Sequence, residues 1–397
     1  MKKIKLLFDT QQLETFGTGK ETGLFRFTSE IFKRLIEKDD IDLYCYLDKK
    51  HKNALEYLKL HYPEYQKQLV YLPNLSKTAR DRNVLIRLKS LFYNLRLSKK
   101  YSRILKEFDW YFSPFNPVSA IVNKNLRSSI FIHDLIPIVC KEITCPKFTK
   151  SYEKFIQNTK CDFIFFNSEN TKKDFLKYRS DYNEKHTAVL YLAADAKFHP
   201  ANNKKIINSI KSKFSIKTEK YFLSVSDLNP RKNILFTVNG FIDFLKKSQA
   251  SDISLVLAGP NKRWNKEVLS SIEDFQKYQD KIIFTGFVDD CDLPSLYSGA
   301  FAFIYTSLYE GFGLPPLEAM QSGVPVITSD ISSLPEVVGD AGILINPTNK
   351  EDLLKNMTHL YQNEELRSSL IEKSLKRSKL FSWEKLVKDL SSTWQNN

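Results

Sequence analysis

The sequence of 397 residues has few cysteines and no long hydrophobic run. No apolar stretch approaches the roughly 18–20 residues that a membrane-spanning helix needs, so a transmembrane protein is not expected. The five cysteines follow no metal-ligand spacing, which argues against a disulfide framework or a zinc site and favours reduced thiols in the cytoplasm. Residues 1–9 begin with lysines but carry only a short apolar stretch before Asp9, so we expect a first β-strand rather than a secretion signal.

Length and charge suggest how the chain is divided. A chain of this length exceeds what one hydrophobic core usually supports, so we expect two domains. Residues 1–200 carry 36 Lys and Arg against 23 Asp and Glu, whereas residues 201–397 carry 24 against 23. Residues 51–100 alone hold 11 basic and 3 acidic side chains. This basic N-terminal half favours an anionic acceptor or surface, such as membrane headgroups, a phosphorylated lipid carrier or an acidic glycan.

Residues 302–327 predict a strand, a glycine turn, a short helix and a second strand. Ala302–Tyr305 is an apolar run typical of a buried strand. Gly311 and Gly313 allow backbone angles that other residues resist. Two prolines then suit a first helical turn, and Gly323 suits the position just past the helix end. Such a crossover presents free N–H groups at the carboxyl edge of a parallel sheet, where phosphate binds well.

Two acids, Glu310 and Glu318, flank this predicted phosphate site. Acids near a helix start are often solvated side chains favoured by the helix dipole. A bare phosphate site would gain nothing from two nearby carboxylates. A nucleotide sugar would, because its hydroxyl groups need acceptors while the backbone N–H groups bind its diphosphate. The pattern therefore favours a nucleotide-sugar site over a simple phosphate site.

This segment resembles the E-x7-E signature of the family 4 retaining glycosyltransferases. The matching parts are the Glu-Gly-Phe-Gly-Leu-Pro core at 310–315, the Glu-Ala-Met helix at 318–320 and the Gly-Val-Pro-Val-Ile strand at 323–327. The resemblance implies the α/β GT-B fold, in which two Rossmann-like parallel-sheet domains face a central cleft. A C-terminal helix then crosses back to the first domain.

A composition break rich in Pro, Asn and Lys at 195–204 places the linker between the domains. We therefore predict an acceptor-side domain at 1–197 and a nucleotide-sugar-binding domain at 198–380. Residues 381–397 resemble the closing helix of the family.

In the second domain, Arg231 and Lys232 follow the strand expected at 221–226. Exposed Arg-Lys pairs are common and usually have no function, but two cations at a strand's carboxyl end can oppose a diphosphate. This pair resembles the family's Arg-Lys-Asn motif, which implies that it neutralises the leaving diphosphate. By the same resemblance Glu310 accepts from donor-sugar hydroxyls and Glu318 from ribose hydroxyls. Further donor contacts are implied at Gly311, Phe312, Gly313, Leu314, Phe287 and Val288, the last two for the base.

In the first domain, His133 ends an apolar strand, where a ligand-facing residue would lie in an open α/β sheet. A lone histidine is more often structural, but the His-Asp-Leu-Ile-Pro context resembles the family histidine that contacts the donor sugar. The role of Asp134 stays open. Gly19 and Gly23 lie in a glycine loop after the first strand, and we take them as counterparts of the loop near the donor diphosphate. No acid completes a dinucleotide fingerprint there, so NAD binding is rejected.

Three other patterns have competing interpretations. Residues 84–100 predict an amphipathic helix with interspersed cations, equally consistent with ordinary packing and with membrane contact. Asp290 and Asp292 have the spacing of a metal-binding D-x-D motif, but we interpret them as helix-start acids. Ser333 and Glu336 have capping-box spacing.

The resemblance implies a retaining, metal-independent transfer of a hexose from a nucleoside-diphosphate sugar to a glycan or lipid-linked acceptor. Nothing in the sequence identifies an enzymic nucleophile. The amino-acid sequences of these motifs resemble those of bacterial polysaccharide and lipopolysaccharide mannosyltransferases, which favours GDP-mannose over a UDP-hexose. We expect no cofactor, no metal and no nucleic acid, and a cytoplasmic protein with peripheral contact at the inner membrane face.

Two other classes are less favoured. A phosphorylase-like or epimerase-like enzyme lacks a recognisable pyridoxal-phosphate lysine. A basic membrane or nucleic-acid adaptor would leave the Glu310–Glu318 segment unexplained.

Overall fold

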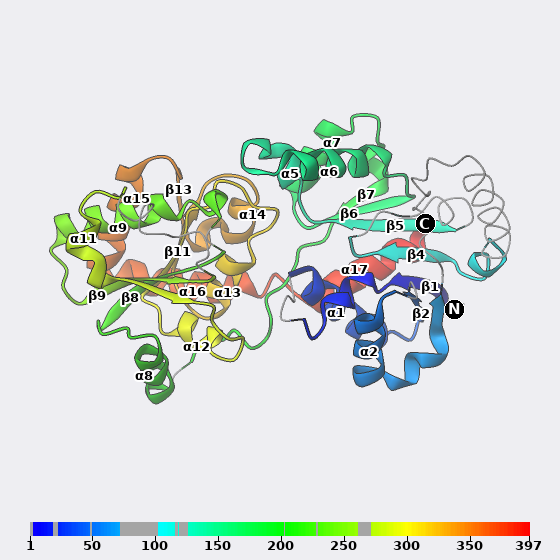
Figure 1. Ribbon diagram of the computed structural model, residues 1–397, viewed down its shortest axis with the longest axis horizontal. Helices are drawn as coiled ribbons and strands as arrows, with labels where there is room; N and C mark the ends of the chain where they lie inside the picture. The colour runs from blue at the N-terminus through cyan, green and yellow to red at the C-terminus, as the bar shows by residue number, and fades with distance from the viewer. Residues whose placement is uncertain are drawn as a thin grey trace, which may run out of the picture.

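The computed structural model describes residues 3–18, 23–47, 50–71, 102–115, 118, 126–201, 203–227, 229–260 and 271–397. Gly19 and the helix predicted at 84–100 lie outside these residues. The described chain forms two α/β units side by side, each built on a parallel sheet and each with helices around it (Figure 1). Among the described helices, none is both long and apolar enough to cross a membrane.

The first sheet has seven strands in the order β3-β2-β1-β4-β5-β6-β7, and its paired strands run parallel. Most of its strand residues are buried, as expected for a parallel sheet covered by helices. Its strands are β1 (Ile4–Asp9), β2 (Ile41–Leu47), β3 (Leu69–Tyr71), β4 (Trp110–Ser113), β5 (Arg127–Ile132), β6 (Phe163–Phe166) and β7 (Thr187–Val189). Its helices are α1 (Gly23–Leu35), α2 (Lys52–His61), α5 (Ile136–Val139), α6 (Pro146–Asn158) and α7 (Glu169–Tyr178).

The second sheet has six parallel strands in the order β10-β9-β8-β11-β12-β13. Its strands are β8 (Lys220–Val225), β9 (Ile253–Ala258), β10 (Ile282–Gly286), β11 (Ala302–Tyr305), β12 (Val326–Ser329) and β13 (Ile343–Ile345). Its helices are α8 (Lys204–Lys213), α9 (Ile234–Ser248), α11 (Phe275–Tyr278), α12 (Leu293–Ser298), α13 (Leu314–Gln321), α14 (Leu334–Val338), α15 (Lys350–Gln362) and α16 (Glu364–Ser378).

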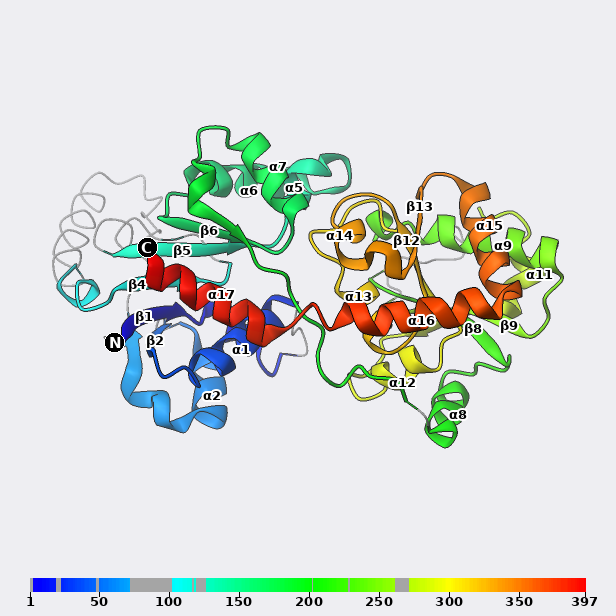
Figure 2. The ribbon, with the colours of Figure 1, turned by 180° about the vertical axis from the view of Figure 1, so that it is seen from behind.

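The last helix, α17 (Trp383–Asn396), belongs in space to the first sheet. Figure 2 shows α16 and α17 following one another along the back of the molecule, from the second unit to the first. Apolar residues at helical spacing on α17 are buried, and Trp394 Nε1 donates to Ser129 Oγ at 3.0 Å. The Trp394 carbonyl accepts from Trp110 Nε1 at 3.1 Å. The chain therefore crosses between the units twice, once after β7 and once before α17.

Strand order reverses in the second sheet between β8 and β11, the two strands that pair at its centre. Ligands of open α/β sheets bind beyond the carboxyl ends of the strands at such a reversal. The loop after β8 carries Arg231 and Lys232, and the loop after β11 carries Glu310. The fold thus brings the adjacent Arg231 and Lys232 together with Glu310, which follows Lys232 by 78 residues.

Candidate functional site

Glu310 lies between the two adjacent cations. Its Oε1 is 2.7 Å from Arg231 Nη1 and 2.7 Å from Lys232 Nζ. All three side chains are largely buried. The short helical turn Pro230–Lys232 is started by Asn229, whose side chain accepts from the Arg231 amide. Local turn chemistry therefore aims both cations toward the end of β11.

The same carboxylate oxygen has two more donors. Tyr305 Oη donates to Glu310 Oε1 at 2.9 Å and Ser307 Oγ donates at 2.6 Å. Among the described residues, Glu310 Oε2 has no hydrogen-bond donor, so it can accept from a ligand hydroxyl. Burial raises the pKa of Glu310, but Lys232 and Arg231 outweigh it and lower that pKa to about 2. Glu310 is therefore a carboxylate throughout the physiological range.

The glycine turn after Glu310 differs in one respect from the expectation. Gly313 has φ +125°, in the region that favours glycine, as predicted. Gly311 does not have a positive φ, so the backbone-angle explanation is wrong for it. Gly311 is instead required by close approach, because a Cβ there would lie 2.2 Å from the His133 carbonyl oxygen of the first domain. The turn is thus shaped by its contact with the other domain.

Free amides line the start of α13. Within the described chain, the N–H groups of Gly313 and Leu314 have no hydrogen-bond acceptor, as expected for the first turn of a helix. Phe312, between the two glycines, is buried against Tyr191 and Phe381 at the crossings between the domains. These amides can receive an anion beside the Glu310 cluster.

His133 follows β5 and faces this turn through its own backbone. Its Nε2 lies 2.9 Å from the Pro114 carbonyl, and its ring packs on Phe27 and Phe131 with ring centroids 4.6 and 4.8 Å away. Burial lowers the pKa of His133 to about 4, although the bond to Pro114 opposes this shift. The ring is therefore neutral near pH 7, with Nε2 protonated and Nδ1 free to accept. Nδ1 can accept a hydrogen bond from a ligand hydroxyl, but the ring does not supply a positive charge near pH 7.

Asp134, whose role the sequence left open, also borders the Glu310 cluster. A Cβ at Gly311 would lie 2.7 Å from Asp134 Cβ. Burial raises the pKa of Asp134 and Glu310 adds to the rise, whereas the Ile136 amide, Arg231 and Lys232 oppose it. Asp134 Oδ1 accepts from the amide of Ile136, the first residue of α5, at 2.9 Å. Asp134 has at least this structural role.

The start of α7 in the first domain holds the glycine turn of the second. Ser168 Oγ and Thr171 Oγ1 both donate to the Gly311 carbonyl, at 2.7 and 3.1 Å. Ser168 and Thr171 are fully buried. We call these contacts, with the Glu336 contacts described next, the α7 clamp. Figure 1 shows α13 and α14 on the side of the second domain that faces the first.

Glu336 and Ser333 do not form the capping box that their spacing predicts. Ser333 Oγ makes no capping bond and instead donates to the carbonyls of Glu310 and Phe312, at 3.0 and 2.6 Å. The Glu336 carboxylate crosses to the first domain and accepts from the amides of Glu169 and Asn170, at 2.8 and 2.7 Å. Glu336 therefore caps α7 of the other domain, a partner that sequence spacing cannot indicate.

Glu318 lies one turn into α13 and is buried. Its Oε2 accepts from Tyr297 Oη at 2.9 Å, and its Oε1 lies 3.4 Å from Arg26 Nη1 on α1. Burial raises the pKa of Glu318 to about 7, although Arg26 and Tyr297 oppose the shift. The pKa values of Glu310 and Glu318 are therefore shifted in opposite directions, although the two residues are only eight positions apart.

The remaining predicted site residues lie in the loop between β10 and α12 and at the start of α1. Phe287 is 74% exposed and Val288 is buried, both directly after β10. Asp290 forms ion pairs with Arg26 and Lys197, and Asp292 with Lys213. Asp292 precedes α12 but makes no side-chain capping bond, so these acids serve as ion-pair partners rather than caps. Gly23 is the first residue of α1, three residues before Arg26.

Sequence reasoning did not single out Tyr305, Ser307 or Arg26. Tyr305 ends β11 and Ser307 follows it, so both lie within five residues of Glu310. Their hydroxyl groups, so close to Glu310 in the sequence, could have identified them as hydrogen-bond donors to its carboxylate. Arg26 had no such local signal, because its partners lie 264 and 292 residues away along the chain.

Comparison with known families identifies part of the chain. Residues 206–377 match the family described as "Glycosyl transferases group 1". The chain is 37% identical over 172 residues to O-antigen chain mannosyltransferase B of Escherichia coli, covering 43% of this chain and 45% of that protein. It is 32% identical over 256 residues to the serotype-specific mannosyltransferase WbdA of Escherichia coli, covering 63% and 31%. The chain thus spans less than half the length of these two relatives.

One relative is similar along most of its length. The O-antigen chain mannosyltransferase RfbU of Salmonella typhimurium is 29% identical over 359 residues, covering 85% of this chain and 88% of that protein.

Solved structures agree on the fold. Anabaena HepE in complex with UDP has a TM-score of 0.70 at 16% identity, covering all of both chains. WaaG, a glycosyltransferase involved in lipopolysaccharide biosynthesis, has a TM-score of 0.65 at 15% identity, covering 99% and 100%. At these identities the likeness establishes the fold alone. The predicted GT-B architecture is confirmed.

Proposed function

We propose that this chain, whose residues 206–377 form a glycosyltransferase group 1 domain, transfers a hexose from a nucleoside-diphosphate sugar to a hydroxyl. The observation that carries the proposal is the Glu310 cluster. It combines two buried cations at the switch point of a parallel sheet with a carboxylate oxygen and two amides that have no hydrogen-bond partner within the described part of the chain. That set matches a diphosphate and a sugar hydroxyl together, which neither a phosphate site nor an adaptor needs.

The chemistry follows from these groups. The bond between the sugar's anomeric carbon and the diphosphate oxygen breaks, and negative charge develops on the diphosphate. Arg231, Lys232 and the amides of Gly313 and Leu314 stabilise that charge, a role that needs no metal ion. The acceptor hydroxyl attacks from the same face, and its proton passes to the departing phosphate oxygen, which retains the anomeric configuration.

Other residues orient the donor. Glu310 Oε2 accepts from a sugar hydroxyl and so fixes the ring against the cations. His133, held neutral by burial, offers Nδ1 to a hydroxyl from the side of the first domain. Glu318 accepts from the ribose hydroxyls, and Phe287 and Val288 lie in the loop assigned to the base. These roles follow the family pattern residue by residue.

For the donor we propose GDP-mannose. The support is the resemblance of the motifs to bacterial mannosyltransferases and the activity for which the relatives are named, since all three are mannosyltransferases and two of them act on O-antigen chains. A UDP-hexose is the alternative, since the HepE structures contain UDP or UDP-glucose. By the same reasoning, the acceptor is a growing polysaccharide or lipid-linked glycan of the cell surface.

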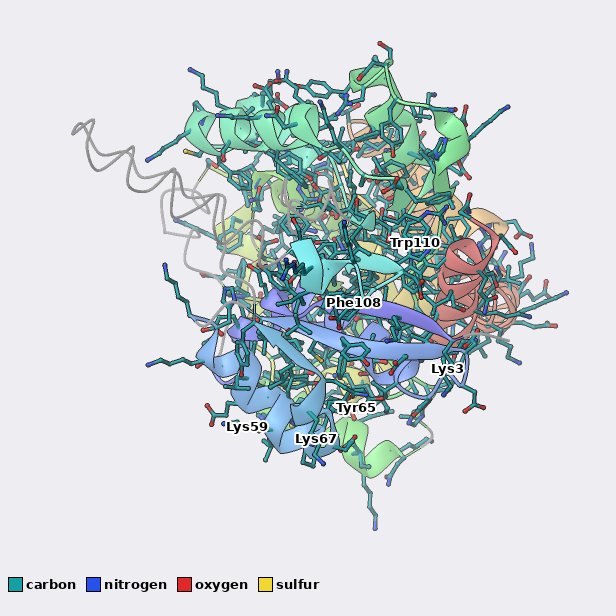
Figure 3. All side chains as sticks on the ribbon, turned by 90° about the vertical axis from the view of Figure 1, so that its right-hand side faces the viewer. Lys3, Lys59, Tyr65, Lys67, Phe108 and Trp110 are labelled. Carbon is teal, nitrogen blue, oxygen red and sulfur yellow. The ribbon has the colours of Figure 1, made fainter. Side chains whose placement is uncertain are left out.

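We further propose that the basic first domain contacts an anionic membrane from the cytoplasmic side. In this domain α2 exposes Leu60 at 66% of its surface. Lys59 of α2 lies on the same side of the domain as Tyr65 and Lys67 (Figure 3). Exposed cations beside an apolar side chain favour anionic headgroups. Binding to vesicles of phosphatidylglycerol at low salt, and none to phosphatidylcholine, is expected. Equal retention on both vesicle types, or on neither, would overturn this assignment.

The transferase proposal is tested by thermal unfolding with GDP, UDP, ADP, TDP and their sugars. A ligand at about 100 times its dissociation constant adds about 2.7 kcal/mol of stability. One base should raise the melting temperature, and Lys232→Ala should lose that shift. A wild-type protein that responds to no nucleotide would contradict the donor site.

A further inference from the structure

Arg26 is the point where the first domain reaches the nucleotide end of the second. It lies on α1, three residues past Gly23, with its side chain 30% exposed. Its Nη1 is 3.4 Å from Glu318 Oε1, and its Nη2 is 3.3 Å from Asp290 Oδ2. One guanidinium therefore joins α1 both to α13 and to the loop before α12. Of its two partners, Glu318 is the residue assigned to the ribose hydroxyls, and Asp290 lies two residues after Val288 in the loop assigned to the base.

The charged surroundings of Glu318 come from several elements. Tyr297 on α12 donates to it at 2.9 Å, and Lys197 of the linker pairs with Asp290 at 2.6 Å. Arg26 and Lys197 favour the ionised form of Glu318, whereas Asp290 disfavours it. Among the described groups acting on Glu318, Arg26 is the cation in direct contact and comes from the first domain. Its contact therefore depends on how the two domains meet.

We propose that Arg26 is a positioning residue for the nucleoside diphosphate, and that it acts by holding Glu318 in its ionised form when the domains are together. This inference rests on the proposed function. A carboxylate presents acceptors on both oxygens, so it can receive both ribose hydroxyls, whereas the protonated acid turns one oxygen into a donor. Arg26 thus links the approach of the first domain to the affinity of the second for its donor.

The expected effect of removing Arg26 follows from the pKa of Glu318. The pKa of Glu318 is about 7 with Arg26 in contact. A cation within about 4–6 Å lowers the pKa of a carboxylate by roughly 1–3 units, so its removal raises that pKa to about 8 or above. At pH 7 a shift of one unit reduces the ionised fraction by about fivefold. At pH 9 the same shift changes it very little.

The experiment measures the dissociation constants of GDP and UDP by calorimetric titration from pH 6 to 9. The proteins are wild type, Arg26→Ala, Arg26→Lys and Lys33→Ala, the last an exposed cation on the same helix. Arg26→Ala should weaken binding about fivefold or more at pH 7, and this deficit should shrink as the pH rises to 9. Arg26→Lys should follow the wild-type pH profile closely, and Lys33→Ala should match it. Circular dichroism confirms that each variant is folded.

Adding Glu318→Gln separates this role from a direct contact. In the Glu318→Gln background, Arg26→Ala should cost nothing further, because no ionisation remains to be controlled. A deficit of Arg26→Ala that is constant from pH 6 to 9, or that persists beside Glu318→Gln, overturns the inference and leaves the proposed function intact. Wild-type protein that binds neither GDP nor UDP at any pH overturns the inference together with the donor assignment on which it rests.

Discussion

The two halves of the molecule use charge in opposite ways. The first 200 residues carry nearly all of the excess positive charge, yet the groups that they bring to the glycine turn beside Glu310 are mainly neutral: the His133 ring and the Ser168 and Thr171 hydroxyls. The second half is almost neutral in sum but holds Arg231, Lys232 and Glu310 buried in one cluster. Net charge therefore marks the outer surface of one half, while the chemistry depends on a locally balanced cluster in the other.

This difference has a physical cause. Exposed lysines are solvated and need no partner, so they can accumulate wherever an anionic surface is approached. Buried charges must be paired, because burying an unpaired charge costs several kcal/mol. Arg26 is an exception on the first domain, since it pairs with Glu318 and Asp290 across the junction.

The largest effect is expected from breaking the balanced cluster. Glu310→Ala leaves Arg231 and Lys232 buried and mutually repelling, so the free energy of unfolding should fall by about 3–5 kcal/mol. Turnover of the donor should fall at least about tenfold, or about 1.4 kcal/mol in the barrier, as it should for Lys232→Ala. Urea unfolding and steady-state turnover measure both. The exposed Asp280→Ala is the matched control, and wild-type turnover in Glu310→Ala would refute the site.

The second-largest effect is expected in how the free energy of unfolding depends on pH, through the ionisation of Glu318. Its pKa of about 7 in the folded state lies above the ordinary 4.5, so the folded protein binds this proton more tightly. The stability from this group is complete below about pH 4.5 and is lost as pH rises through 7. In Glu318→Gln that loss, on the order of 3 kcal/mol, should be absent. Urea unfolding from pH 4.5 to 8 compares the two, and parallel pH profiles would contradict the raised pKa.

A substitution at Gly311, with a smaller expected effect, tests whether the contact between the two domains at the glycine turn matters for their packing and for turnover. A Cβ at Gly311 would lie 2.2 Å from the His133 carbonyl, so Gly311→Ala should cost about 1–3 kcal/mol through overpacking. It should also push the domains apart. Small-angle X-ray scattering should therefore give a larger radius of gyration, and turnover should fall. A variant with unchanged scattering and turnover would show that the contact has no role.

The smallest effect concerns the outer part of the α7 clamp. Glu336→Ala removes the acceptor for the Glu169 and Asn170 amides, a loss expected to cost about 1–2 kcal/mol, like that of a helix cap. Unfolding should become less cooperative between the domains, visible as a broader calorimetric transition. Glu365→Ala, exposed in the first turn of α16, serves as the control. If both variants unfold alike, Glu336 does not couple the domains.

Short-range signals in the sequence identified much of the molecule. Apolar runs predicted the strands, and proline and glycine at 315–323 bounded α13 within one or two residues. The Glu310 segment and the Arg231–Lys232 pair were recognisable because each is contiguous and carries its own turn chemistry. These features depend on backbone preferences over a few residues, which the local sequence contains.

Tertiary structure alone decided which groups meet. Lys232 reaches Glu310 across 78 residues because β8 and β11 are neighbours at the strand reversal, and Arg26 reaches Glu318 across 292 residues because the domains dock. The reason for Gly311 and the true partner of Glu336 likewise come from the other domain. Spacing along the chain specifies turns and helix faces. It does not specify the pairing of distant loops, which follows from strand order and from the packing of one domain on the other.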